Sequence, residues 1–190
     1  MKKIIITGGS GFIGSNLVNF LIKKNFFVIN IDKLTYSSNN LAHKNKQNRN
    51  YKFFKLDINN KTKLIKIVKK YRPSAIFNLA AETHVDRSID GPKNFIESNI
   101  NGTFNLLECF KKYSYKNKKT RLVHISTDEV YGDILKGRSA ETDSYNPSSP
   151  YAATKASSDH LVSSYIRTFK YPQLLQTVQI IMVQDNIQKN

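Results

Sequence analysis

Short apolar runs alternate with segments of helical periodicity along most of the chain. The run "KKIIIT" at 2–7 is bounded by glycines and is typical of a buried strand. The segment that follows, "FIGSNLVNFLIKK" at 12–24, places apolar residues at helical spacing: Phe12, Ile13, Leu17, Phe20 and Leu21. The same criteria predict strands at 26–32, 50–58, 74–81 and 121–127, and helices at 63–71, about 92–113 and 149–169.

This alternation of strand and helix predicts an α/β fold with a doubly wound, mostly parallel sheet and helices on both faces. A chain of 190 residues can bury one full core. No apolar stretch approaches membrane-spanning length, and the run after the initial "MKK" is too short for a signal peptide. We therefore expect a cytoplasmic protein without a membrane partner.

The net charge of +16 raises the possibility of nucleic-acid binding. The basic residues, however, are spread over segments expected at the surface, such as "KNKQNRNYK" at 44–52 and "KKYSYKNKK" at 111–119. This distribution favours a solvated surface over a nucleic-acid partner. The single cysteine, Cys109, excludes an internal disulfide framework and is compatible with the cytosol.

A glycine-rich segment joins the first strand to the first helix. It contains Gly9-x-Gly11-x-x-Gly14, preceded by Gly8, and in this position the pattern is typical of a turn that holds a pyrophosphate at a helix N-terminus. The second strand ends at Asp32, whose carboxylate can accept hydrogen bonds from ribose hydroxyls. This favours NAD over NADP, although Lys33 weakens the preference slightly.

Asp57 follows the third predicted strand and has two interpretations. It can reach an adenine from its loop, or it can cap the helix that follows. The sequence favours neither interpretation.

A second group of polar residues follows the strand at 121–127. "STDEVYG" stands where ligands of open α/β sheets bind, and "PYAATK" then places Tyr151 and Lys155 on one face of a helix. A nearby ammonium is expected to lower the pKa of the tyrosine, so that the pair can remove a proton from a substrate hydroxyl.

Five segments together carry a resemblance to a known family: "TGGSGFIGS", "DKLTYSSN", "NLAAETHVDRSI", "STDEVYG" and "YAATKASSDHLV". They resemble the extended short-chain dehydrogenase/reductase family, and within it the dTDP-glucose 4,6-dehydratases. The resemblance covers residues 1–172 and implies a Rossmann-like NAD-binding domain. It also implies dehydration of dTDP-glucose to the 4-keto-6-deoxy sugar in nucleotide-sugar (rhamnose type) biosynthesis, and a homodimer when full length.

The resemblance assigns a role to each residue of the chemical centre. Tyr151, assisted by Thr127, would deprotonate the sugar 4-hydroxyl while hydride moves to NAD. Glu129 would then remove the C5 proton, and a protonated Asp128 would donate to the departing 6-hydroxyl. Lys155 would hold the nicotinamide ribose.

The resemblance also implies two sets of binding residues and no metal. Thr83 and Thr127 would contact the sugar. His84 lies in the same segment, but a single histidine there is more often structural. The cofactor set is Gly8, Gly11, Phe12, Ile13, Gly14, Asp32, Lys33, Leu34, Thr35, Asp57, Ile58, Ala80, Ala81, Thr83, Asn99, Tyr151 and Lys155.

The last residues, "QLLQTVQIIMVQDNIQKN" at 173–190, do not resemble the family. Back-translated and read two nucleotides later, they can spell "IITNCSNNYGPRQYPEK", which resembles the family's continuation. We therefore interpret 173–190 as a frameshift tail, with the substrate domain missing. For this polypeptide we expect weak or absent NAD binding and negligible turnover, because remote binding energy supports the reacting centre.

Two alternatives remain open. The chain can belong to a nucleotide-sugar 4-epimerase or another 4,6-dehydratase, although the adjacent carboxylates of Asp128 and Glu129 argue against an epimerase. It can also be a non-catalytic nucleotide-binding remnant, or a basic binder that uses the positive charge.

Overall fold

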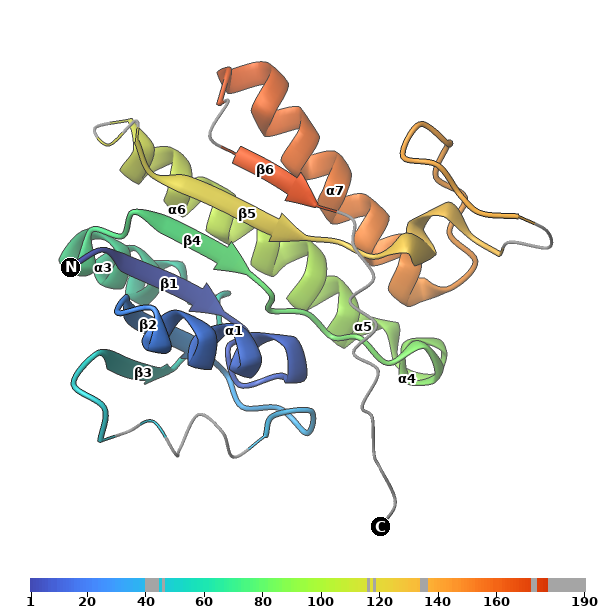
Figure 1. Ribbon diagram of the computed structural model, residues 1–190. Coiled ribbons are helices and arrows are strands. Elements are labelled where there is room, and N and C mark those ends of the chain that lie inside the picture. The colour runs from blue at the N-terminus through green and yellow to red at the C-terminus, as the bar shows by residue number, and fades with distance from the viewer. Residues whose placement is uncertain are drawn as a thin grey trace, which may run out of the picture.

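The computed structural model describes residues 1–39, 45, 47–115, 117, 119–133 and 137–171, and the backbone of 174–177 (Figure 1). Strands and helices alternate along the chain, as the apolar pattern predicts. The elements are β1 (Lys3–Thr7), α1 (Phe12–Lys23), β2 (Phe27–Asp32), β3 (Tyr51–Lys55), α3 (Lys61–Tyr71), β4 (Ala75–Asn78), α4 (Val85–Asp90), α5 (Pro92–Phe95), the π-helix η1 (Ile96–Asn101), α6 (Gly102–Ser114), β5 (Arg121–Ile125), the 3₁₀-helix η2 (Asp128–Tyr131), α7 (Pro150–Phe169) and β6 (Leu174–Thr177).

The described strands form one six-stranded sheet in the order β3-β2-β1-β4-β5-β6, and each neighbouring pair is parallel. Thr7 at the end of β1 stands opposite Ile31 of β2 and Asn78 of β4. The carboxyl ends of the strands therefore meet at one edge of the sheet, where ligands of such folds bind. The predicted doubly wound parallel sheet is confirmed.

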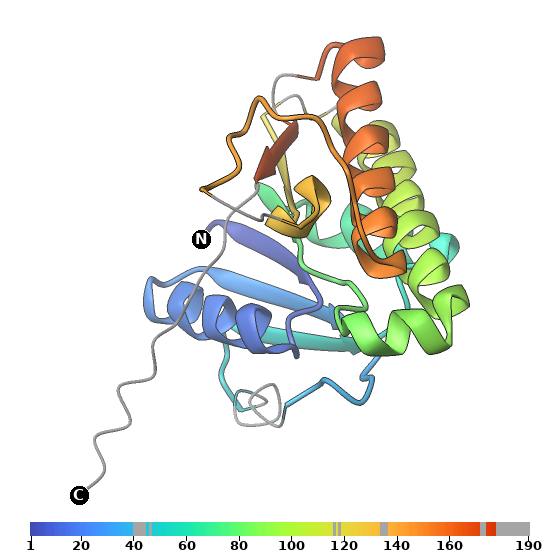
Figure 2. The ribbon, with the colours of Figure 1, turned by 90° about the vertical axis from the view of Figure 1, so that its right-hand side faces the viewer.

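Alternating side chains of the central strands enter two separate cores. Ile5 and Ile29 face the core made with α3, α6 and α7, whereas Ile4, Ile6 and Val28 face the core made with α1. Figure 2 shows α1 on one side of the sheet and α6 and α7 on the other. Burial of apolar side chains on both faces fixes the strands, and thereby the positions of their ends.

The structure differs from the predicted elements in five places. The helix expected at about 92–113 is interrupted by the π-helix Ile96–Asn101, and α4 and η2 were not predicted. These elements have six residues or fewer, too few for a hydrophobic period. The strands predicted at 50–58 and 74–81 end early, at Lys55 and Asn78, because the chain leaves the sheet there to line a cavity.

The tail of residues 173–190 lies almost entirely outside the described residues. Leu174–Thr177 is the exception, and its backbone pairs in parallel with Leu122–Ile125 of β5. This agrees with the apolar alternation of the segment, which suits a sheet edge whatever its origin.

A line of buried polar side chains joins the sheet to α7. Thr7 donates to Asn78 Oδ1 at 2.6 Å, so the Asn78 amide nitrogen faces His124 Nδ1 at 3.0 Å. His124 Nε2 then carries the proton and lies 3.4 Å from Asp159 Oδ1. The other oxygen of Asp159 accepts from the hydroxyls of Ser126 and Tyr145. Because burial makes unpaired polar groups costly, these contacts hold α7 in one register against β5.

The titration of His124 generates a prediction for stability. Burial lowers the pKa of His124, the charge of Lys155 lowers it further, and Asp159 opposes both. Below its usual pKa of 6.5 the unfolded histidine binds a proton that the folded one does not, so acid favours unfolding. We expect the free energy of unfolding to fall, by up to about 1.4 kcal/mol per pH unit, as the pH drops from 6.5 toward 5.

Denaturant titrations of the 190-residue chain and of His124→Gln over this pH range check the prediction. Glutamine keeps an acceptor for Asn78 and a donor toward Asp159 but does not titrate. The variant should therefore lose most of the slope. An equal slope in both proteins would assign the acid sensitivity to another group.

Candidate functional site

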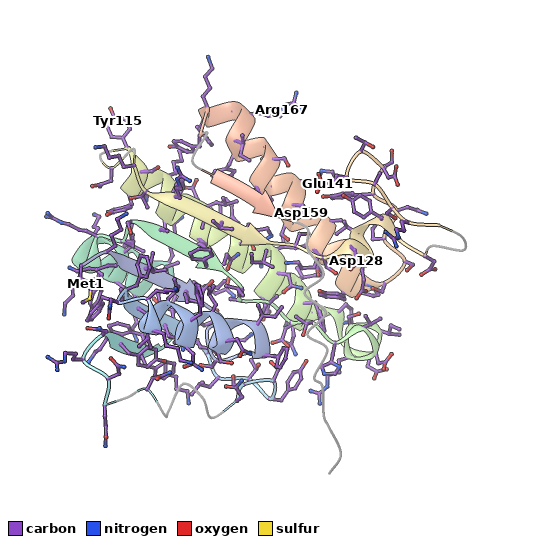
Figure 3. The ribbon with its side chains drawn as sticks, viewed as in Figure 1. Met1, Tyr115, Asp128, Glu141, Asp159 and Arg167 are labelled. Carbon is purple, nitrogen blue, oxygen red and sulfur yellow. The ribbon has the colours of Figure 1, made fainter. Side chains whose placement is uncertain are left out.

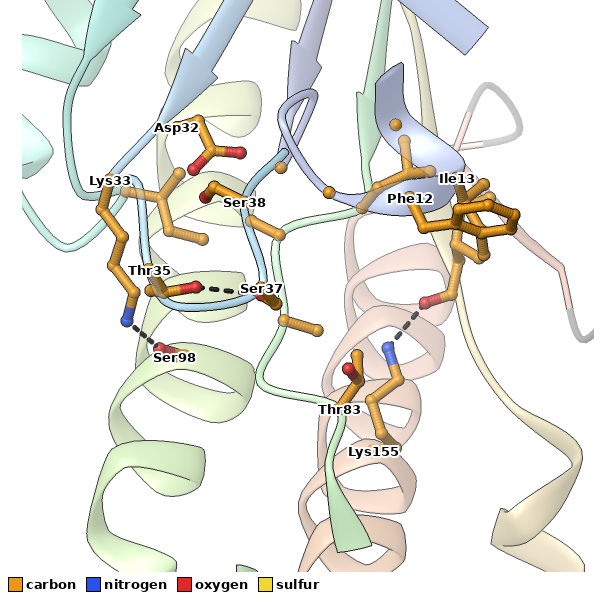
Figure 4. A pocket seen from close by; sticks show the side chains of 18 of the residues that line it. Phe12, Ile13, Asp32, Lys33, Thr35, Ser37, Ser38, Thr83, Ser98 and Lys155 are labelled. Carbon is orange, nitrogen blue, oxygen red and sulfur yellow. Dashed lines mark hydrogen bonds between the residues drawn. The ribbon is translucent and has the colours of Figure 1, made fainter. Parts of the chain in front are cut away.

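A cavity of about 530 Å³ runs along the carboxyl ends of β1, β2, β4 and β5 (Figure 4). The glycine turn after β1 forms one wall, and the loop after β2 forms another. The segment after β4 and the N-terminal turn of α7 complete it. Of the predicted binding and catalytic residues, all but Leu34, Asn99 and Glu129 line this cavity.

The glycines of the turn serve two different purposes. Gly8 has φ +73°, and an added Cβ would come within 2.5 Å of the Ala80 nitrogen. A Cβ at Gly14 would lie 2.1 Å from the Gly8 oxygen, so both positions need glycine for backbone packing. A Cβ at Gly11 would meet just the Gly8 oxygen at 3.5 Å, an ordinary contact. The space at Gly11 therefore belongs to the cavity, as expected where backbone approaches a ligand.

The N-terminus of α1 opens into the same wall. Gly11 is its N-cap and gives no side-chain capping bond, and the first turn contains no acidic residue. Phe12 and Ile13, the first two helical residues, line the cavity and remain 59% and 41% exposed. Uncapped N–H groups at a helix N-terminus favour an anion, and a diphosphate suits this position.

Asp32 lies at the end of β2 and is held by backbone. Its two oxygens accept from the N–H groups of Ser10, at 2.9 Å, and Leu34, at 2.8 Å. Leu34 has φ +62°, which turns its N–H toward the carboxylate, while its side chain stays out of the cavity lining. The carboxylate retains lone pairs for further donors, because each oxygen can accept two bonds.

The capping interpretation of Asp57 is wrong. The N-cap of α3 is Asn60, whose side-chain oxygen accepts from the Lys63 N–H at 3.0 Å. Asp57 instead accepts from the N–H of Asn59 at 2.8 Å and lines the cavity together with Ile58. Contact between Asp57 and an adenine is the interpretation that remains to be tested.

The other end of the cavity holds Thr127, Asp128, Tyr151 and Lys155. Ser149 caps α7 through the Ala152 N–H, and Pro150 occupies the first helical position. The helix therefore starts immediately before Tyr151, and Lys155 follows one turn later. Lys155 is buried, and its ammonium donates to the Ile125 carbonyl at 2.6 Å, the bond drawn at the right of Figure 4.

The predicted lowering of the tyrosine pKa by the lysine is absent. Burial raises the pKa of Tyr151 to about 12; the hydrogen bond with Thr127 lowers it, and nearby carboxylates raise it. Burial also lowers the pKa of Lys155 to about 8, against the opposing charge of Asp159. The physical reason is that desolvation dominates and that the Lys155 ammonium is directed to a backbone carbonyl.

Glu129 is the second carboxylate of the Asp128–Glu129 pair. Burial, and then the charge of Asp128, raises the pKa of Glu129. Its side chain is exposed and does not line the cavity, whereas Asp128 lines it. Glu129 follows Asp128 in the first turn of η2, whose N-cap is Thr127.

Asn99 acts as a clamp rather than as part of the cavity wall. It accepts from the Glu82 N–H at 2.8 Å, and its amide donates to the Glu82 carbonyl at 3.0 Å and to Thr154 at 2.9 Å. The π-helix carries Asn99, and such local widenings often occur at functional sites. The clamp ties the segment after β4 to α7.

Several lining residues were not identified from the sequence. His84, judged structural, also lines the cavity. The serines stand in the loop after β2 and in the π-helix, where no motif marks them, although a run of Ser residues after a strand was a usable signal. The remaining ones are Ile31, Ser37, Ser38, Leu56, Leu79, Ser98, Ile125 and Ser126.

The residues that the structure describes include no group of three or more His, Cys, Asp or Glu that could hold a metal ion. None of their helices combines the length and the hydropathy needed to cross a membrane.

Comparisons with known proteins agree with this geometry. The sequence profile of the GDP-mannose 4,6 dehydratase family matches residues 5–180. A dTDP-glucose 4,6-dehydratase of Haemophilus influenzae is 48% identical over 184 residues, covering 92% of this chain and 54% of the relative. The chain thus spans about half the length of the curated relatives it matches.

Solved structures with a similar fold include a dehydratase and an epimerase. The dTDP-glucose 4,6-dehydratase DesIV of Streptomyces venezuelae, solved with NAD bound, superposes with a TM-score of 0.85 at 37% identity, covering 93% of this chain and 55% of that one. A UDP-glucose 4-epimerase of Thermus thermophilus, in complex with NAD, gives 0.79 at 30% identity over 92% of this chain and 53% of that one. Curated relatives such as the Haemophilus influenzae protein are dTDP-glucose 4,6-dehydratases, and the chain belongs to the GDP-mannose 4,6-dehydratase family.

Proposed function

We propose that this chain is the NAD-binding part of a dTDP-glucose 4,6-dehydratase. The observation that carries the proposal is the single cavity that joins the glycine turn and Asp32 to the Thr127–Asp128 and Tyr151–Lys155 groups. A dinucleotide needs an anion site in its middle and polar groups at both ends, and the cavity offers this order. The relatives with NAD bound support the choice of cofactor.

Each part of the proposed cofactor is assigned to its own group of cavity residues. The N-terminus of α1 and Gly11 suit the diphosphate, Asp32 with Lys33, Leu34 and Thr35 the adenosine ribose, and Asp57 with Ile58 the adenine. The chemistry that bound NAD supplies is reversible acceptance of a hydride, together with the positive charge of the oxidised nicotinamide. Ala80, Ala81 and Thr83 follow the wall between the two ends.

Tyr151 is the proposed base for the sugar 4-hydroxyl. A phenol with a pKa near 12 holds its proton at neutral pH, so the site needs positive charge to generate the phenolate. Lys155 is one turn away, and a shift of its ammonium from the Ile125 carbonyl toward the cavity would provide that charge. Thr127, whose side chain lowers the pKa of Tyr151, is proposed to orient the hydroxyl.

Glu129 is the proposed base for the sugar C5 proton, and Asp128 the proposed acid for the 6-hydroxyl. A raised pKa moves a carboxylate toward neutral pH, where a general base is most effective, and this supports the role of Glu129. Two adjacent carboxyls are not required by an epimerase, so the pair favours dehydration. Thr83 and Thr127, both lining the cavity, suit the sugar.

Three further statements belong to the proposal. Residues 1–172 form the NAD-binding domain, and 173–190 is a frameshift tail. The full-length protein acts as a homodimer, consistent with exposed apolar side chains such as Ile96 and Phe104 on η1 and α6. Its location is cytoplasmic, consistent with the single buried cysteine, Cys109.

The proposal predicts that NAD binding and dehydratase activity depend on the part of the relatives that this chain does not cover. The 190-residue chain should bind NAD weakly at best and should not turn over dTDP-glucose. A fusion of residues 1–171 to the part of the Haemophilus influenzae dehydratase beyond its matched segment should regain both activities, because the added part supplies remote binding energy. Calorimetry with NAD and detection of the 4-keto product check this. Turnover by the 190-residue chain, or a fusion that binds NAD without forming the product, would contradict the proposal.

The same fusion tests Tyr151. Tyr151→Phe removes the proposed base and should lower kcat by about a hundredfold or more, with a much smaller effect on NAD binding. Tyr165→Phe is the matched control, because Tyr165 lies on α7 like Tyr151 but outside the cavity lining, and its hydroxyl donates to Glu108 of α6. Equal activity of the two variants would exclude Tyr151 as the base.

The interpretation of the tail is tested on the coding DNA. From about codon 173, a reading frame shifted by two nucleotides should encode "IITNCSNNYGPRQYPEK" and continue into a substrate domain. Independent sequencing from codon 165 through several hundred nucleotides checks the prediction. A shifted frame without this segment would show that the tail has another origin.

A further inference from the structure

Lys33 is a cation close to the proposed ribose site, where an ammonium could bind the 2′-phosphate of NADP. It follows Asp32 directly and lines the cavity beside it. Dinucleotide sites that accept NADP use a basic side chain near the ribose to hold the 2′-phosphate. Asp32 alone therefore does not explain a preference for NAD, since a free ammonium beside it would offset the repulsion.

The ammonium of Lys33 is already engaged by the protein. It donates to the Ser98 hydroxyl at 2.6 Å and lies 3.2 Å from Glu82 Oε1. Figure 4 shows the side chain extended away from Asp32 toward Ser98 on the π-helix. The Glu82 side chain is 7% exposed and that of Lys33 is 32% exposed, so solvent screens this pair less than a surface pair.

Glu82 is fixed before any ligand binds. Asn99 accepts from its backbone N–H and donates to its carbonyl, and Asn99 in turn bonds to Thr154 of α7. The carboxylate is thus held toward Lys33 by the backbone around it rather than by the flexible lysine. Because the Glu82 carboxylate is already held in place, it loses little conformational entropy when it pairs with Lys33.

Glu82 also engages the loop at a second point. The Tyr36 hydroxyl hydrogen-bonds with Glu82, and burial and the charge of Glu82 raise the pKa of Tyr36. The Arg87 guanidinium lies 3.6 Å from the centre of the Tyr36 ring, so this second cation is stacked on the loop. One buried carboxylate therefore contacts two side chains of the loop after β2.

We propose that Glu82 is a specificity-determining residue, which selects NAD over NADP by holding the Lys33 ammonium away from the ribose 2′ position. The inference rests on the proposed NAD-binding function and deepens it. Loss of the Glu82 charge would release Lys33, and the released ammonium could then contact a 2′-phosphate. Asp32 would still disfavour NADP, so the change is a shift of preference rather than a reversal.

The test compares dissociation constants of NAD and NADP in the 190-residue chain, measured by calorimetry, and in the fusion protein if binding to the chain is too weak. Glu82→Gln keeps the size and hydrogen-bonding capacity of the side chain while removing its charge. We expect the ratio of the NADP to the NAD dissociation constant to fall about fivefold. Glu97→Gln, an exposed neighbour of Ser98, removes the same charge without touching Lys33 and should leave the ratio unchanged.

A double variant assigns the effect to the lysine. Lys33→Met combined with Glu82→Gln should return the ratio to its original value or above it. An unchanged ratio in Glu82→Gln, while NAD still binds, would overturn the role of Glu82 and leave the proposed function intact. Failure of both the unmodified chain and the fusion protein to bind NAD would instead overturn the proposed function, and this inference with it.

Discussion

The site depends on one backbone contact, the packing of the first strand-to-helix turn against the end of β4. Gly8 approaches the Ala80 nitrogen so closely that no side chain fits between them, and Gly14 packs on the Gly8 carbonyl in the same way. This contact sets where the N-terminus of α1 opens and fixes the wall that Ala80 contributes. Because both partners are backbone, the contact has little freedom to relax, and the geometry of the cavity follows from it.

At both ends of this cavity, a buried acidic group acts on a lysine that lines the cavity. Asp159, on α7, bonds to Ser126 and Tyr145 and offsets part of the desolvation of Lys155. Glu82, clamped by Asn99, plays the corresponding part for Lys33. In each case the acid is fixed by several hydrogen bonds while the lysine keeps a flexible stem. Buried charges are costly alone, so such pairing determines which cations remain available to a ligand.

The sequence predicted what arises from local pattern and missed what arises from packing. The alternation of strands and helices, the glycine turn and the Tyr151–Lys155 pair follow from apolar periods and short spacings. The π-helix, the clamp of Asn99 and the contact of Lys33 with Glu82 depend on residues 17 to 49 positions apart, as Glu82 lies 17 from Asn99 and 49 from Lys33. The raised pKa of Tyr151 was missed for the same reason, since burial is a tertiary property.

The half-length chain separates two requirements that an enzyme normally satisfies together. The groups proposed for proton transfer come from the segment after β5, from η2 and from α7, which are held by the sheet and its cores. Under the proposed function, substrate positioning would need surface beyond the two threonines of the cavity. On the α1 side of the sheet, Phe77 and Val123 are partly uncovered, so this face of β4 and β5 has room for further packing. Reacting groups can therefore be in place without the binding energy that makes them effective, and the two can be restored separately.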